Sequence, residues 1–160
     1  MIGRVTAADV VELTEGRPAT LGQGRLICLD GPAGSGKTTL ATGIEELTGA
    51  AVVHLDDLYP GWSGLTEIQG PVTGLLAALA EGRPGGYRRY DWYAGAFAEE
   101  VVVEPAPLLV LEGVGAGGRA WAAWTTTLVW VEAAPEVRRE PPGAELERSP
   151  VWLSQPMAVR

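Results

Sequence analysis

Glycines and a single lysine cluster between residues 31 and 38, in the order Gly-Pro-Ala-Gly-Ser-Gly-Lys-Thr. Residues of these types at this spacing can surround a phosphate group. Glycines permit the backbone angles that turn successive N–H groups inward, and a lysine ammonium supplies a compact positive charge. Lys37 is the only lysine among twelve basic residues, and the other eleven are arginine. A planar guanidinium would fit such a cradle poorly, so a lysine at this point agrees with a phosphate-binding role.

The pattern Gly-x-x-x-x-Gly-Lys-Thr is that of a Walker A loop, and it predicts bound ATP together with Mg²⁺. We expect the β and γ phosphates to meet the amine of Lys37, which would also act in catalysis, and Mg²⁺ to meet the hydroxyl of Thr38. A glycine-rich turn that happens to precede a lysine is the alternative interpretation. The residues expected to contact the nucleotide are Gly31, Pro32, Ala33, Gly34, Ser35, Gly36, Lys37, Thr38 and Thr39.

Three carboxylates directly follow short apolar runs. Asp56 and Asp57 come after residues 51–55, and Glu112 comes after residues 108–111. In an open parallel sheet the carboxyl ends of the strands line the ligand crevice, so these groups can face the phosphates. Phosphoryl transfer needs carboxylates that hold Mg²⁺, here Asp57 or Glu112, and that act on the acceptor hydroxyl. A solvated turn, a helix cap or an ordinary strand end are the alternatives.

Some remaining side chains admit two interpretations. The only histidine, His54, lies within a strand pattern, where a packed or hydrogen-bonded role is favoured over a ligand role. The only cysteine, Cys28, lies within an apolar run and is expected to be a buried small residue. Five aromatic residues form either a wall for a base or sugar or part of the core, and the sequence favours neither. They are Tyr59, Trp62, Tyr90, Trp92 and Tyr93.

These residues must be positioned by elements that the apolar patterns predict. We expect helices over residues 7–15, 37–47, 71–80 and 119–124. We expect strands over residues 25–30, 51–55, 108–111 and 126–131. Strands separated by helices imply parallel pairing, hence one α/β domain over residues 1–160. Residues 87–104 show no clean period, and residues 141–160 are expected to be an irregular tail without a further strand.

Composition excludes several partners. The net charge of −8 disfavours a nucleic-acid polymer, whose binding depends on many lysine and arginine contacts. The apolar runs are too short for a membrane span, and the N-terminus lacks the pattern of a signal peptide. One cysteine cannot form an internal disulfide. We therefore expect a cytoplasmic protein without a membrane partner.

Taken together, these segments resemble the uridine kinase-like branch of P-loop kinases, over roughly residues 25–135. The resemblance rests on residues 30–41, 55–59, 90–92 and 110–114. The first segment is typical of P-loop proteins in general. The second, Leu-Asp-Asp-Leu-Tyr, is similar to the family's Asp-Asp-Phe-Tyr motif and narrows the choice to small-molecule kinases.

The resemblance implies a three-layer P-loop NTPase fold, with a parallel sheet of five strands in the order 2-3-1-4-5. It implies that Asp56 is the catalytic base, that Tyr59 contacts the acceptor, and that Asp91 holds sugar hydroxyls. Such kinases also carry an arginine-rich lid helix and a fifth strand after the fourth strand. In this chain only Arg138 and Arg139 could serve in a lid, and the pattern shows no fifth strand.

The leading hypothesis is an ATP-dependent phosphotransferase acting on a hydroxyl of a nucleoside or a similar small metabolite. The absence of a clear lid motivates a second hypothesis, a non-catalytic or degenerate ATP-binding protein. A third is a P-loop NTPase that hydrolyses ATP without an acceptor.

Overall fold

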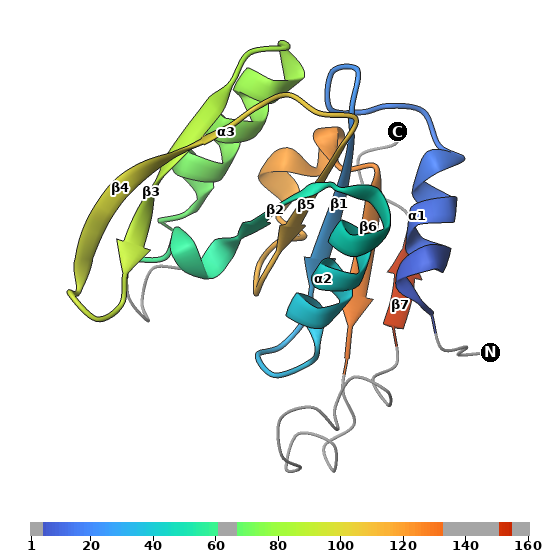
Figure 1. The fold of residues 1–160 in the computed structure, drawn as a ribbon, viewed down its shortest axis with the longest axis horizontal. Coiled ribbons are helices and arrows are strands. Elements are labelled where there is room, and N and C mark those ends of the chain that lie inside the picture. Colours follow the sequence, from blue (N-terminus) through green and yellow to red (C-terminus); the bar gives the residue numbers. More distant parts are fainter. Residues whose placement is uncertain (1–4, 61–66, 133–150, 155–160) are drawn as a thin grey trace.

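The computed structural model describes residues 5–60, 67–132 and 151–154. A central sheet lies between helices on both of its faces (Figure 1). The helical elements are α1 (Ala7–Glu15), α2 (Lys37–Thr48), η1 (Leu55–Asp57), α3 (Gln69–Ala80) and η2 (Arg119–Trp124). The strands are β1 (Arg25–Asp30), β2 (Ala51–His54), β3 (Gly85–Asp91), β4 (Ala96–Val103), β5 (Leu108–Glu112), β6 (Thr127–Val131) and β7 (Val151–Ser154). All eight predicted helices and strands are confirmed, with boundaries that differ by at most two residues and with η2 a 3₁₀ helix.

The order of strands in the main sheet is β2-β5-β1-β6-β7. The first four of these strands pair in parallel, as alternating strands and helices predict. When the five strands of this sheet are numbered by their order along the chain, their order across the sheet is 2-3-1-4-5, as the resemblance implied. The α/β prediction is therefore confirmed for the sheet.

The last strand requires a correction. An irregular tail without a strand was expected over residues 141–160, but four of these residues form β7. This strand pairs antiparallel with β6, whereas the resemblance implied a parallel fifth strand. A four-residue edge strand leaves too short an apolar pattern to be recognised in sequence.

Both faces of the sheet are covered, which explains the continuous apolar runs of its strands. Along β1, Leu26 and Cys28 pack on the side of α3, while Ile27 and Leu29 pack on the side of α1 and α2. All four side chains are fully buried, which confirms the interpretation of Cys28. Burial of an aliphatic side chain of this size stabilises a fold by about 1.5–3 kcal/mol.

A hairpin of β3 and β4 forms a second, two-stranded sheet that projects beside α3, away from the main sheet (Figure 1). Residues 87–104 show no clean period in the sequence, so this hairpin was not predicted. The pairing shifts register between Arg88 and Tyr90, which interrupts the alternation that would reveal a strand. The hairpin places Asp91 and Trp92 at the tip that lies near η1.

Candidate functional site

The glycine-rich loop joins the carboxyl end of β1 to the first turn of α2. Gly31 has φ 144°, and a Cβ built on it would lie 2.0 Å from the carbonyl oxygen of Val131. The loop therefore packs closely against the end of β6, which only glycine permits. Helix α2 begins at Lys37, and its N-cap, Gly36, has φ 100° and no side-chain hydrogen bond to the helix. The first amides of α2 thus remain available to an anion, in the way that helix N-termini bind phosphate.

Lys37 folds back over this loop. Its Nζ donates to the carbonyl oxygen of Pro32 at 2.7 Å and to Oγ of Ser35 at 3.3 Å. The side chain is only 7% exposed, and burial lowers the pKa of the amine, while the charges of Glu112, Asp30 and Asp56 act in the opposite direction. The amine is therefore held by the loop's own backbone and hydroxyl groups.

Glu112 connects the loop to the neighbouring strands. The Thr38 hydroxyl donates to both carboxylate oxygens of Glu112, at 3.3 and 3.4 Å. His54 Nδ1 lies 2.5 Å from Oε1 of the same carboxylate. The Glu112 hydrogen bond raises the pKa of His54, against a smaller effect of burial. The structure thus confirms the hydrogen-bonded interpretation of His54.

A hydroxyl beside a buried carboxylate is a donor set that fits Mg²⁺. In the described residues no group of three or more His, Cys, Asp or Glu side chains could hold a metal by itself. Mg²⁺ in nucleotide sites is usually held by one or two protein oxygens together with phosphates and water. Thr38 and Glu112 fit that pattern. Asp57 lies near enough to His54 for their charges to interact, and burial raises the pKa of its carboxyl.

Asp56 belongs to η1, which follows β2 directly. Its side chain is exposed, and its charge influences the pKa of Lys37 across the site. Its backbone carbonyl accepts a hydrogen bond of 2.9 Å from the indole Nε1 of Trp92. The turn that carries Asp56 is therefore tied to the tip of the hairpin.

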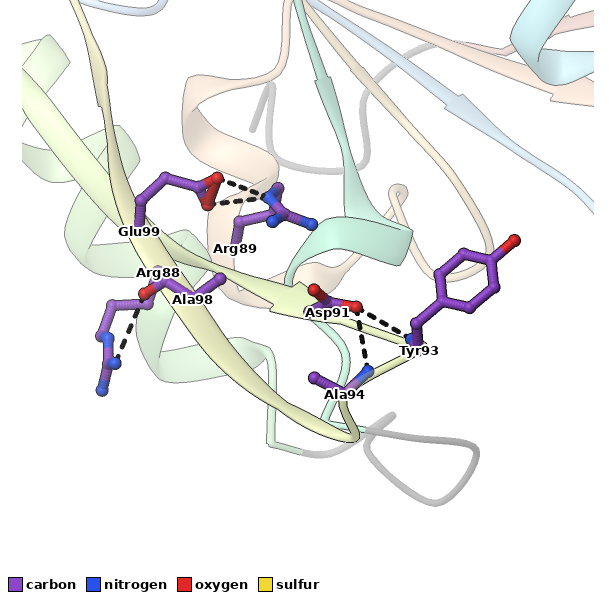
Figure 2. Close-up of polar contacts among 7 residues, drawn as sticks. All are labelled: Arg88, Arg89, Asp91, Tyr93, Ala94, Ala98 and Glu99. Atoms are coloured by element: carbon purple, nitrogen blue, oxygen red, sulfur yellow. Dashed lines mark hydrogen bonds and ion pairs between the residues drawn. The ribbon is translucent and has the colours of Figure 1, made fainter.

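The other two predicted acceptor residues have partners within the protein. Tyr59 is 8% exposed, and its hydroxyl donates to the carbonyl oxygen of Val114. One oxygen of Asp91 accepts from the amides of Tyr93 and Ala94 at 2.9 and 3.1 Å, which fixes the hairpin turn (Figure 2). Both side chains thus have structural partners at positions where the resemblance implied contacts with an acceptor.

The predicted aromatic group divides between core and surface. Tyr59 lies in the core, whereas Trp92 and Tyr93 are exposed at 40% and 105%. Tyr90 packs edge to face against Trp92, with ring centroids 5.5 Å apart. Trp62, Arg138 and Arg139 lie outside the described residues.

Asp30 was not assigned a role from the sequence. Its carboxylate accepts hydrogen bonds from the backbone amides of Gly31, Gly115 and Gly117, at 2.7, 2.9 and 2.9 Å. These three hydrogen bonds hold the loop after β5 against the glycine-rich loop. The only feature of the sequence that points to Asp30 is its place at the end of an apolar run. Many strands without a functional role also end in an acidic residue, so this feature does not identify a site.

A cavity of about 590 Å³ lies at the opposite end of the sheet, where β1 and β5 begin. Its lining includes residues 21–24, 79–82 and 104–107. None of the predicted site residues borders it. The cavity therefore lies apart from the glycine-rich loop.

The sheet order, the helices on both faces and the loop between β1 and α2 define an α/β protein with a P-loop NTPase-like fold. Among solved structures, the chain is similar to one described as a possible uridine kinase from Bacillus stearothermophilus. The TM-score is 0.56 and the sequence identity 18%, over 72% of this chain and 74% of that chain. Likeness at this identity shows the fold. No family model and no curated protein matches the chain.

Within the part of the chain that the structure describes, no helix is both long enough and apolar enough to cross a bilayer.

Proposed function

We propose that this chain is an ATP-dependent kinase that phosphorylates a hydroxyl of a nucleoside or of a similar small metabolite. The observation that carries the proposal is one continuous arrangement of groups. Lys37 folds into the loop, Thr38 meets Glu112 at the edge of the loop, and Asp56 lies exposed across from Lys37. Under the proposal, this arrangement would supply anion binding, metal-binding oxygens and a carboxylate base.

Each residue has a defined task under this proposal. The loop amides and the N-terminus of α2 bind the phosphates, and Lys37 neutralises their charge. Thr38 and Glu112, with Asp57 as a further candidate, would hold Mg²⁺, which adds charge neutralisation between the phosphates when bound. Asp56 accepts the proton of the acceptor hydroxyl. The rest of the rate gain comes from alignment of the reacting groups.

Three variants test the proposal by calorimetry of ATP binding and by transfer of labelled phosphate to a panel of nucleosides. Lys37→Ala is expected to lose ATP binding, because the amine is the only lysine charge in the loop. Asp56→Ala is expected to keep ATP binding and to lose transfer by a factor of about 10²–10⁴, the usual contribution of a general base. Glu46→Gln, an exposed change on α2, is the control and should behave like the wild type. Full transfer by Asp56→Ala would contradict the base assignment.

One observation favours a second function, an ATP-binding protein without phosphotransfer. Tyr59 and Asp91, the two residues expected to hold the acceptor, already bind Val114 and the hairpin turn. The same labelling experiment separates the functions. ATP binding without any labelled nucleoside would support the binding protein, whereas free labelled phosphate would indicate hydrolysis of ATP.

A further inference from the structure

The pairing of β2 with β5 brings two polar residues together at the edge of the phosphate site. His54 and Glu112 are the last residues of their strands, and they are direct partners in the parallel register. Paired residues in neighbouring strands project to the same face of a sheet. The register therefore makes His54 the neighbour of Glu112, and the 2.5 Å contact between Nδ1 and Oε1 follows from it.

Glu112 is held from two directions. The Thr38 hydroxyl reaches both of its oxygens from α2, and His54 reaches one oxygen from β2. A carboxylate in its ionised form only accepts hydrogen bonds, and with Glu112 in that form Nδ1 of His54 is the donor of this contact. Glu112 is 4% exposed, and a buried carboxylate without such donors would be strongly destabilised. These contacts fix the direction in which its oxygens point.

We propose that His54 is a positioning residue that holds Glu112 beside Thr38 for Mg²⁺ binding. The inference rests on the proposed function, because the metal enters with the nucleotide. Mg²⁺ demands near-octahedral geometry, so a carboxylate that can rotate binds it less well. Outer hydrogen-bond partners of metal ligands typically change metal affinity or activity by 10- to 100-fold.

A purely structural role for His54 predicts a different result. The side chain of His54 is 41% exposed, and its removal opens no large cavity in the core. A structural defect would weaken ATP binding equally with and without Mg²⁺. A positioning defect would weaken only the part of ATP binding that Mg²⁺ adds.

The experiment measures ATP affinity by calorimetry in Mg²⁺ and in EDTA, for the wild type and two variants. His54→Ala is expected to bind ATP like the wild type in EDTA but to lose about 10-fold or more of the gain from Mg²⁺. His54→Asn is expected to keep most of that gain, because its side-chain amide nitrogen replaces Nδ1 as the donor. Leu47→Ala, a 60% exposed position on α2, is the surface control.

A double-mutant cycle with Glu112→Gln tests whether His54 acts through Glu112. In the Glu112→Gln background, His54→Ala should cause no further loss of the gain from Mg²⁺. A His54→Ala protein with the full gain, or with equal losses in Mg²⁺ and EDTA, would overturn the inference alone. Both the inference and the proposed function would be overturned if the wild-type protein bound no ATP, or if its affinity for ATP were the same in Mg²⁺ and in EDTA.

Discussion

Gly31 and Gly34 lie in the same loop but differ in their surroundings, which allows a matched test of the loop geometry. Gly31 has φ 144°, and a Cβ on it would lie 2.0 Å from the carbonyl oxygen of Val131. Gly34 has φ 74°, and a Cβ on it would meet nothing within 4 Å. Alanine at either position is strained, but only Gly31→Ala also collides with backbone.

The two costs can be estimated separately. Alanine in the left-handed region costs about 1–2 kcal/mol, and this is the whole expected effect of Gly34→Ala. For Gly31→Ala, backbone strain of about 1–3 kcal/mol is joined by an overpacking cost of about 1–3 kcal/mol. The overpacking cost arises because a real Cβ atom essentially never lies within 3.0 Å of another heavy atom. The loop or the end of β6 must therefore move to make room for the alanine Cβ. We therefore expect Gly31→Ala to be less stable than Gly34→Ala by roughly 1–4 kcal/mol.

Thermal unfolding without nucleotide measures this difference directly. For a chain of this size 1 kcal/mol corresponds to about 2–4 °C in Tm. Gly34→Ala should lose a few degrees, and Gly31→Ala should lose on the order of 10 °C. Equal Tm values for the two variants would refute the packing of the loop against Val131, and with it the geometry from which the phosphate site is argued.

Two further predictions concern single buried groups. Burial raises the pKa of Cys28 to about 12, so the folded protein should not react with a thiol reagent at pH 8, and labelling should begin only under denaturing conditions. Rapid labelling of the native protein would contradict the burial of β1. Burial, with smaller effects of Asp30 and Asp56, raises the pKa of Tyr59 to about 12, whereas an unfolded tyrosine ionises near pH 10. The unfolded state therefore loses its proton first, and stability should fall as pH rises from about 10 to 12. Urea unfolding across this range should show a smaller fall for Tyr59→Phe; an unchanged fall would contradict the assignment.

The strand, the glycine-rich loop and the helix around Lys37 could be predicted because they are local in sequence. One segment, residues 25–48, supplies the strand, the glycine-rich turn and the helix, and each carries its own signal. The turn needs glycines, the strand needs an apolar run, and the helix ends at Gly49, which has φ 73°. No distant contact has to be known to place Lys37 and Thr38 together.

The contact of His54 with Glu112 could not be predicted, because it depends on strand register. The sequence places each residue at the end of an apolar run, but it does not say which strands are neighbours or how they align. A shift of one residue would turn either side chain to the other face of the sheet. The same limit applies to Asp30, whose partners Gly115 and Gly117 lie about 85 residues away in sequence.

The proposed acceptor half of the site is assembled from segments that lie far apart in sequence. Asp56 lies on η1, and the hairpin that approaches it lies more than thirty residues later, joined by the Trp92 hydrogen bond to the Asp56 carbonyl. The hairpin in turn is stiffened by the ion pair of Arg89 with Glu99, at 2.7 Å (Figure 2). Exposed aromatic surface at Trp92 and Tyr93 lies at the same tip. It follows that, under the proposed function, an acceptor that reaches Asp56 would lie beside the exposed aromatic side chains of the hairpin tip.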